Sequence, residues 1–345
     1  MKIELLSPAL EDIYQDYLLS NPQSLFYYSI KYKRFLKELL GCEEQYLLAL
    51  QDGEVKGVLP LMYYQQSDSR LYNSLPYYGS NGGILTTIPE AEKALVNVYN
   101  EVIRAANVLA ATVVTNPLLL QKENNFLYNY TDSRIGQWTN ISIAVEENIQ
   151  QKLLDGIDGS ARRNIKKALS SEIEVSIDHS AFPRLKELHQ TNISSIGGSF
   201  KTEKFFSLVP KHFKPGEDYD LFVAKKDGLV IAALLLFYFN KTVEYFTPAL
   251  QEEYRSLQAI PLIIITAMEN AAQRGFKWWN WGGTWQSQEG VYRFKKKWGA
   301  IDKRYYYYTQ VNDLSLLSRT PSDLLSLFPN FYVLPFSELH SNATN

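Results

Sequence analysis

Residues 219–250 read YDLFVAKKDGLVIAALLLFYFNKTVEYFTPAL and contain three apolar runs. Asp227-Gly228 separates the first two runs, and Asn240-Lys241 separates the last two. Asp-Gly between apolar runs is a strong signal for a two-residue hairpin turn, because both residues tolerate a positive φ. The stretch therefore predicts three consecutive antiparallel strands.

The first half of the chain contains a related pattern. Residues 44–65 read EQYLLALQDGEVKGVLPLMYYQ, in which Asp52-Gly53 separates two further apolar runs. In each half another strand-like segment and a long helix-like segment follow, and we expect these helices over 89–106 and 257–273. We therefore predict a mixed α/β (α+β) protein of two tandem lobes, each a mostly antiparallel mixed sheet flanked by helices.

We infer the boundaries of the lobes from the turn-forming and polar residues between these patterns. We expect the first lobe at residues 1–150, the second at 151–315, and a C-terminal extension at 316–345 that packs back on the first lobe. Further helices are expected at 5–19, 29–40, 161–170, 182–196 and 202–210. Further strands are expected at 108–115, 141–145, 173–177, 276–281 and 304–310.

Composition and charge narrow the class of protein. Of the 345 residues, 46% are hydrophobic and 21% are charged, which is enough apolar material for two packed cores. The formal net charge of −2 argues against an extended DNA-binding face, and the single cysteine, Cys42, excludes a disulfide framework. The apolar runs 229–239 and 259–268 are shorter than the roughly 20 residues that a membrane helix needs. We expect a soluble, cytoplasmic protein that is a monomer or weak dimer.

A basic segment, SARRNIKKA, occupies residues 160–168. We expect a helix with Ser160 as its N-cap and with Ile165 and Leu169 facing the core. On that helix basic side chains stack at spacing i to i+4 and repel one another, and a bound anion would relieve the repulsion. The candidate acceptor-binding residues here are Arg162, Arg163, Asn164 and Lys166. The alternative is a solvated charged face.

A second candidate anion site lies at the start of QEEYRSLQAIPLIIITAMENAAQRG, residues 251–275. A loop leads from a strand into an apolar helix there, and free N–H groups at a helix N-terminus attract anions. The candidate donor-binding residues of this region are Thr247, Ala249, Arg255, Ser256 and Gln258. The alternative is a buried helix without a ligand.

The aromatic segment WWNWGGTWQSQEGVYRFKKKWGA occupies residues 278–300. Gly282 and Gly283 allow close approach of a ligand to the backbone, and a lysine among aromatic rings can stabilise a developing oxyanion. Packing aromatics with solvated lysines are the alternative. A fourth candidate is the loop SLPYYGSNGG at 74–83, either a plain turn or a substrate-contacting loop through Tyr78.

Several common chemistries are absent from the sequence. The four histidines form no HExxH motif, and no GxSxG, Walker A or GxGxxG motif occurs. We therefore expect no metal cofactor.

The order of these motifs resembles a known group. The basic helix, the hairpin of 219–238, the segment VEYFTPAL, the apolar helix ending at Gly275, and WNWGGTW with FKKKWGA together resemble the Fem-like branch of the GNAT acyltransferase superfamily. That branch includes the FemABX peptidyl transferases and FemAB-related, BioF-like acetyltransferase-domain proteins. The resemblance implies two tandem GNAT-like lobes, with the second carrying the transfer site.

The resemblance also implies acyl transfer to an amine. In Fem enzymes the acceptor is a nucleotide-linked peptidoglycan precursor and the donor is an aminoacyl-tRNA, whereas GNAT relatives use acyl-CoA. The Phe-Lys pair of the transfer site falls on Phe294 and Lys295, and the basic acceptor-binding position falls on Arg162. The GNAT diphosphate signature is degenerate in this chain, and the charged helical arm by which some Fem proteins bind tRNA has no counterpart between Ser176 and Asp220.

These inferences combine into one functional hypothesis. We expect an N-acyltransferase acting on a cell-envelope or polysaccharide precursor, with acyl-CoA or aminoacyl-tRNA as donor and a small-molecule or nucleotide-linked acceptor. Lys295 and backbone N–H groups near Thr247–Ala249 would bind the oxyanion, with Phe294 and Tyr292 beside them. The candidate general bases are Glu244, Glu289 and Tyr292. The alternative is a non-catalytic binding protein for a nucleotide sugar or envelope precursor.

Overall fold

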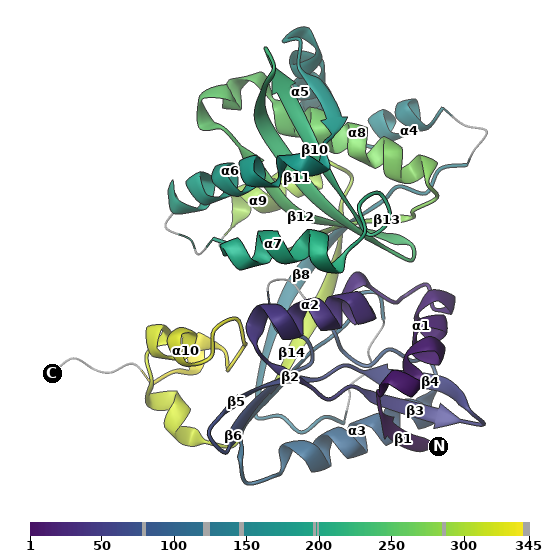
Figure 1. The fold of residues 1–345 in the computed structure, drawn as a ribbon, viewed down its shortest axis with the longest axis vertical. Helices are drawn as coiled ribbons and strands as arrows, with labels where there is room; N and C mark the ends of the chain where they lie inside the picture. Colours follow the sequence, from purple (N-terminus) through teal and green to yellow (C-terminus); the bar gives the residue numbers. More distant parts are fainter. Residues whose placement is uncertain are drawn as a thin grey trace, which may run out of the picture. The chain divides into compact units, whose positions relative to one another are not determined.

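The computed structural model describes residues 1–77, 81–119, 125–144, 148–195, 198, 200–284 and 288–340. The chain packs as two compact units (Figure 1). Unit 1 comprises Met1–Arg134 with Arg304–Asn345, and unit 2 comprises Ile135–Lys303. The boundaries fall inside strands β8 (Tyr130–Asn140) and β14 (Ile301–Val311). A strand interior lacks the turn residues from which the sequence divisions at 150 and 315 were inferred.

Unit 1 contains a small sheet of strands β1-β3-β4 and a second set of strands in the order β2-β5-β6-β7-β14. Its strands other than β14 are β1 (Lys2–Leu5), β2 (Glu43–Glu44), β3 (Leu47–Gln51), β4 (Glu54–Leu59), β5 (Met62–Gln66), β6 (Ser69–Asn73) and β7 (Val108–Val114). Its α-helices are α1 (Glu11–Ser20), α2 (Ile30–Leu40), α3 (Pro89–Ile103) and α10 (Pro321–Leu327). The predicted hairpin at Asp52-Gly53 is confirmed as the β3–β4 turn, with φ of 54° and 81° at these residues.

Unit 2 contains strands in the order β8-β13-β12-β11-β10-β9. The strands after β8 are β9 (Glu174–Ile177), β10 (Tyr219–Lys226), β11 (Leu229–Phe239), β12 (Thr242–Leu250) and β13 (Trp278–Thr284). Its α-helices are α4 (Ile149–Asp155), α5 (Gly159–Ser170), α6 (Phe182–Ser195), α7 (Glu203–His212), α8 (Ala259–Gln273) and α9 (Glu289–Lys296). The three predicted strands of 219–250 are confirmed as β10, β11 and β12, and the mixed α/β class is confirmed with them.

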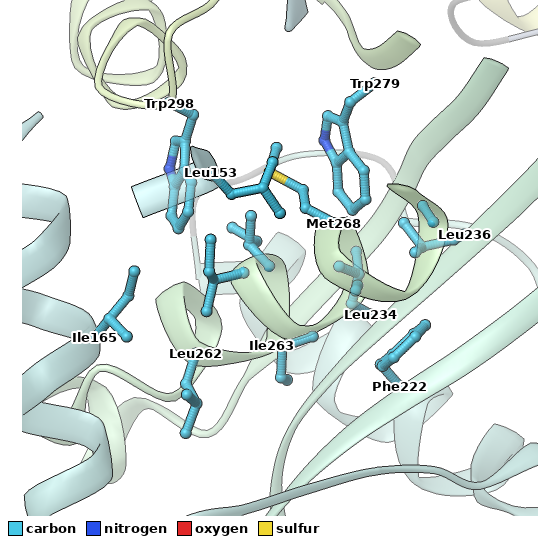
Figure 2. Packing of buried hydrophobic residues seen from close by; sticks show 14 of the residues in the cluster. Leu153, Ile165, Phe222, Leu234, Leu236, Leu262, Ile263, Met268, Trp279 and Trp298 are labelled. Atoms are coloured by element: carbon cyan, nitrogen blue, oxygen red, sulfur yellow. The ribbon is translucent and has the colours of Figure 1, made fainter. Parts of the chain in front are cut away.

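Helix α8 organises the core of unit 2. Its apolar side chains face both the sheet and the helices α4 and α5, so the helix is hydrophobic on nearly every side. Figure 2 shows Ile263 and Met268 of α8 on the side of Leu234 and Leu236 of β11, and Leu262 on the side of Ile165 of α5. Each such side chain contributes about 1.5–3 kcal/mol of transfer free energy on full burial.

Helices α6 and α7 cover the opposite face of the same sheet. The Phe205 ring of α7 stacks parallel to Phe246 of β12, with centroids 5.8 Å apart, and Phe246 also contacts Phe237 of β11 at 5.0 Å. Phe246 lies at a bulge, because the β11–β12 register shifts between the pairs Leu236–Tyr245 and Leu235–Thr247. The bulge turns Phe246 toward α7.

Three local predictions are wrong. The strand expected at 141–145 is absent from its described residues 141–144, and the strand that closes this region, β8, ends before it at Asn140. The N-cap of α5 is Asp158, whose carboxylate accepts the Ser160 N–H at 2.7 Å, because an Asp two residues earlier reaches the first turn. Leu169 is 60% exposed, since the buried stripe of α5 follows Ala161, Ile165 and Ala168 at helical spacing and passes one residue before it.

Candidate active site

Strands β12 and β13 run parallel for three residue pairs and then part. The pairs are Thr242–Trp278, Val243–Trp279 and Glu244–Asn280, and among the described residues the recorded pairing ends there. Beyond this point β12 has its bulge at Phe246, and β13 shifts register against β8 between Asn280 and Gly283. Where two parallel strands diverge, their facing N–H and C=O groups no longer pair with each other and can bind a ligand. The candidate site lies at this divergence of β12 and β13.

Asn280 joins the two strands where they part. Its Nδ2 donates to Glu244 Oε2 at 2.7 Å, and its Oδ1 accepts the Gly282 N–H at 2.9 Å. Asn280 and Glu244 are each only 2% exposed. A buried carboxylate is costly unless it is hydrogen-bonded, so this amide stabilises Glu244 at the divergence.

Lys295 of α9 points at the end of β13. Its ammonium donates to Thr284 Oγ1 at 2.9 Å, to Gly283 O at 3.1 Å and to Gly282 O at 3.4 Å. An ammonium has three hydrogens, so the strand end supplies an acceptor for each. Lys295 is 6% exposed, and burial lowers its pKa from 10.5 to about 8.

The other two predicted catalytic residues have different neighbours. The Tyr292 hydroxyl donates to Asp302 at 2.7 Å, and this hydrogen bond, with smaller contributions from burial and charge, raises the pKa of Tyr292. The Phe294 ring packs edge-on against Trp281 and Trp298, at 6.1 and 6.2 Å between centroids. Of the three, the structure brings only Lys295 to the divergent end of β13.

The backbone of β12 near Thr247 and Ala249 faces the neighbouring ladder. The Gln251 N–H donates to Ile231 O, and antiparallel residues alternate in direction, so the N–H groups two and four residues earlier also point at β11. Pro248, between them, has no N–H. The predicted oxyanion donors of this segment are therefore directed away from the divergence.

The N–H and C=O of Leu250 point to the other edge of β12, away from β11, and both already have hydrogen-bond partners. Asn192 of α6 places its carboxamide against Leu250, accepting its N–H at 2.8 Å and donating to its C=O at 2.6 Å. The side chain of Thr247 is 1% exposed, and its hydroxyl has no hydrogen-bond partner among the described residues.

The start of α8 does not form a diphosphate cradle. Arg255 is exposed and paired with Glu252 at 2.8 Å, and Glu253 adds a second acid to the same turn. Ser256 is exposed, and Gln258, at φ 63°, donates its side-chain amide to Arg255 O. Pro261 removes an N–H from the first turn. The residues present therefore do not fit the diphosphate of CoA.

The basic start of α5 is fixed against the segment that follows α9. The Asp158 N–H donates to Lys297 O at 2.8 Å. Gly299 has φ 70°, and a Cβ there would lie 2.8 Å from Gly156 O, so only glycine allows this approach. The contact holds the first turn of α5 beside the end of the FKKKWG segment.

The predicted acceptor-binding residues are distributed unevenly over this region. The guanidinium groups of Arg162 and Arg163 both lie close to Gly159, and Arg162 donates to Leu154 O at 3.0 Å. Lys166 is exposed and Asn164 is half-buried on the same helix. Gly282 and Gly283 belong to β13 and contact Lys295, as given above. Tyr78 lies outside the described residues.

Sequence reasoning did not identify Gln137, Thr284, Asn280 or Asn192 as site residues. The first three are polar residues inside strands with 0–5% exposure, and a polar letter within an apolar strand is the signal that marks them. A cavity of about 370 Å³ lies elsewhere, in unit 1, and is lined by Gln45, Arg70, Tyr72, Glu101, Val102, Ala105, Asn107 and Val108. None of the predicted site residues lines it.

The fold defines a class of protein through its structural neighbours. FemX gives a TM-score of 0.69 at 16% identity, covering 92% of this chain and 98% of that one. The C-terminal domain (DUF2156) of a putative lysylphosphatidylglycerol synthetase from Agrobacterium fabrum gives 0.53 at 13% identity, with 95% and 100% covered. A tandem GNAT protein from the clavulanic acid biosynthesis pathway gives 0.51 at 10% identity, with 90% and 98% covered. These likenesses define a GNAT-type fold.

Part of unit 2 also resembles a known family in sequence. Residues 217–306 match the sequence model of the FemAB family, and this segment contains β10 to β13, α8 and α9. No protein among curated sequences matches. The match and the fold confirm the resemblance to the Fem-like branch of the GNAT superfamily and support an acyltransferase.

The described part of the chain contains neither a membrane-spanning helix nor a metal-binding cluster. Within the described part of the chain, no helix is both long and apolar enough to cross a membrane. Within the same residues, no group of three or more His, Cys, Asp or Glu side chains is arranged to hold a metal ion.

Proposed function

We propose that this protein transfers an acyl or aminoacyl group to an amine of a cell-envelope or polysaccharide precursor. The observation that carries the proposal is the placement of Lys295. Its ammonium is buried at the end of β13 and contacts Gly282, whose N–H donates to Asn280 of the Asn280–Glu244 bridge; all of these residues match the FemAB family. A cation in a site with little water stabilises a developing oxyanion far better than a solvated cation does.

The proposed chemistry is an addition followed by an elimination. The acceptor amine forms a C–N bond to the donor carbonyl, whose oxygen becomes an oxyanion. Lys295 donates to that oxyanion in place of its longest hydrogen bond, to Gly282 O at 3.4 Å. The C–O or C–S bond to the donor then breaks, and the proton lost by the amine ends on the departing oxygen or sulfur.

Glu244 is the candidate base that fits this scheme best. Glu289 is exposed and paired with Arg293, and Tyr292 donates to Asp302. Glu244 is the candidate that sits where the strands part, and it would take the amine proton before passing it to the leaving group.

An aminoacyl ester of tRNA fits the proposed donor better than acyl-CoA does. The acidic, proline-containing start of α8 supports this choice, because it would repel a diphosphate. The neighbouring pair Arg162 and Arg163 would hold an anionic, nucleotide-linked acceptor. Charged tRNA and such precursors occur in the cytoplasm, where we expect the protein to act.

The test compares Lys295→Ala with Lys296→Ala, its exposed neighbour on α9. Purified protein is assayed with aminoacyl-tRNA or acyl-CoA and a UDP-linked muropeptide, and product is measured by mass spectrometry. Loss of an oxyanion donor lowers kcat by about 10²–10³, so Lys295→Ala should lose activity while Lys296→Ala keeps it. Equal activities would remove Lys295 from the mechanism. Acceptor binding without any product would favour a binding protein instead.

A further inference from the structure

Gln137 of β8 is fully buried and forms both of its side-chain hydrogen bonds next to Lys295. Its Nε2 donates to the backbone carbonyl of Tyr292 at 3.2 Å, within α9, the helix that carries Lys295. Its Oε1 accepts from the Thr284 hydroxyl at 2.8 Å. A buried amide with both ends satisfied holds one orientation.

The donors and acceptors in this row of hydrogen bonds, from Tyr292 through Gln137 and Thr284 to Lys295, are all set by one group that can only accept. A backbone carbonyl can only accept, so the NH₂ end of Gln137 must face Tyr292 and its oxygen must face Thr284. The single hydroxyl hydrogen of Thr284 is then used toward Gln137. Thr284 Oγ1 is left as an acceptor, and it meets the Lys295 ammonium at 2.9 Å.

We propose that Gln137 is a positioning residue that, through Thr284, keeps Lys295 charged and aimed at the divergent end of β13. The nearest acceptor of the ammonium, at 2.9 Å, is the one whose direction Gln137 sets. Burial opposes the charge, and an oriented acceptor offsets that penalty. The proposal adds a residue to the proposed transfer site, but its effect on Lys295 can be measured without any substrate.

The experiment titrates Lys295 in the whole protein by NMR of ¹³C-labelled lysine Cε, with the signal assigned by its loss in Lys295→Met. Two substitutions of equal size at Gln137 should move the pKa of Lys295 in opposite directions. Gln137→Leu frees the Thr284 hydroxyl and should lower it. Gln137→Glu keeps an oxygen facing Thr284 and loses the hydrogen bond to Tyr292 O. Once ionised, it adds a negative charge nearby, which should raise the pKa of Lys295 by about one unit or more.

Substitutions at Thr284 give the matched pair. Thr284→Val removes the acceptor at constant shape and should lower the pKa of Lys295 by about one unit, more than Gln137→Leu does. Thr284→Ser retains the hydroxyl and should restore the wild-type value. Tryptophan fluorescence confirms that each variant is folded before titration.

A purely structural role for Gln137 predicts a different pattern. It would leave the pKa of Lys295 unchanged, or shifted in the same direction, in Gln137→Leu and Gln137→Glu, and either result overturns the proposal. An activity assay is a separate arm. If the pKa values shift as expected but Lys295→Ala retains full transfer activity, Lys295 is removed from the transfer mechanism while its positioning by Gln137 stands. If the wild type gives no product with any of the donors, the proposed function fails and the positioning again stands.

Discussion

Lys295→Met should make the stability of unit 2 less dependent on pH. The substitution replaces a buried ammonium with an apolar chain of similar length. In the folded protein burial lowers the pKa of Lys295 to about 8, whereas the unfolded chain titrates near 10.5. The folded state therefore binds fewer protons than the unfolded state between these pH values, and lysine at this position gains stability as pH rises.

The size of the effect follows from the two pKa values. At pH 7 both states carry the proton, and the burial of charge costs the folded state roughly 3 kcal/mol at 1.36 kcal/mol per unit. At pH 9.5 the folded lysine is mostly neutral, and the cost falls to roughly 1 kcal/mol. The free energy of unfolding of the wild type, relative to Lys295→Met, should thus rise by roughly 2 kcal/mol between pH 7 and pH 9.5.

The tryptophans offer a readout confined to unit 2. All six lie between Ile135 and Lys303 in the sequence, at positions 138, 278, 279, 281, 285 and 298. Urea denaturation followed by tryptophan fluorescence therefore reports the unfolding of this unit. The substitution also removes the hydrogen bonds of the ammonium, which adds a constant to the difference in unfolding free energy between wild type and variant. The change of that difference with pH is therefore the quantity that tests the burial of the charge.

Lys296→Met is the control for this measurement. Lys296 carries the same charge on the exposed side of α9, so its replacement should give no comparable rise. If the stability difference between wild type and Lys295→Met stays constant from pH 7 to pH 9.5, Lys295 is not held against a burial penalty, and the reasoning behind the site is refuted.

Two further predictions concern the start of α5 and the segment after α9 that contacts it. Gly299→Ala should destabilise unit 2 by roughly 2–3 kcal/mol, because the new methyl group clashes with Gly156 O and the residue keeps a strained positive φ. Gly275→Ala, at φ 81° with no atom nearby, should lose only about 1 kcal/mol. If the two variants have similar urea midpoints, the close contact between Gly299 and Gly156 is refuted. The double variant Arg162→Ala, Arg163→Ala should bind a UDP-linked acceptor at least tenfold more weakly, since a hydrogen bond to a charged group contributes about 1.5–3 kcal/mol. Its melting temperature should stay unchanged, and calorimetry measures both quantities. Unchanged affinity would exclude these arginines from the acceptor site.

The hairpins could be predicted from the sequence because their signals are local. Asp52-Gly53 and Asp227-Gly228 adopt positive φ angles, and Asn240 does so at the next turn. Such turns require residues that tolerate that conformation, and the apolar runs beside them have the length of strands. The three strands of 219–250 therefore needed no tertiary information.

Strand β8 could not be read in the same way. Its buried positions include Gln137 and Thr139, whose polarity makes sense only with partners that are distant in sequence. The Thr139 hydroxyl donates to Trp298 O at 2.9 Å and accepts from Trp281 Nε1 at 2.9 Å. Periodicity scores such residues as exposed, which is why the strand was displaced to 141–145.

By itself, the sequence determined the residue types of the proposed transfer site and their order along the chain, with Lys295 and the basic helix as its charged parts. Tertiary structure alone decided what those residues contact. It set Lys295 against the end of β13, tied Asn280 to Glu244, and turned the N–H groups near Thr247 into the β11 ladder. The physical reason is range: turns and apolar periodicity act within a few residues, whereas a buried charge is governed by acceptors that only the folded chain brings together.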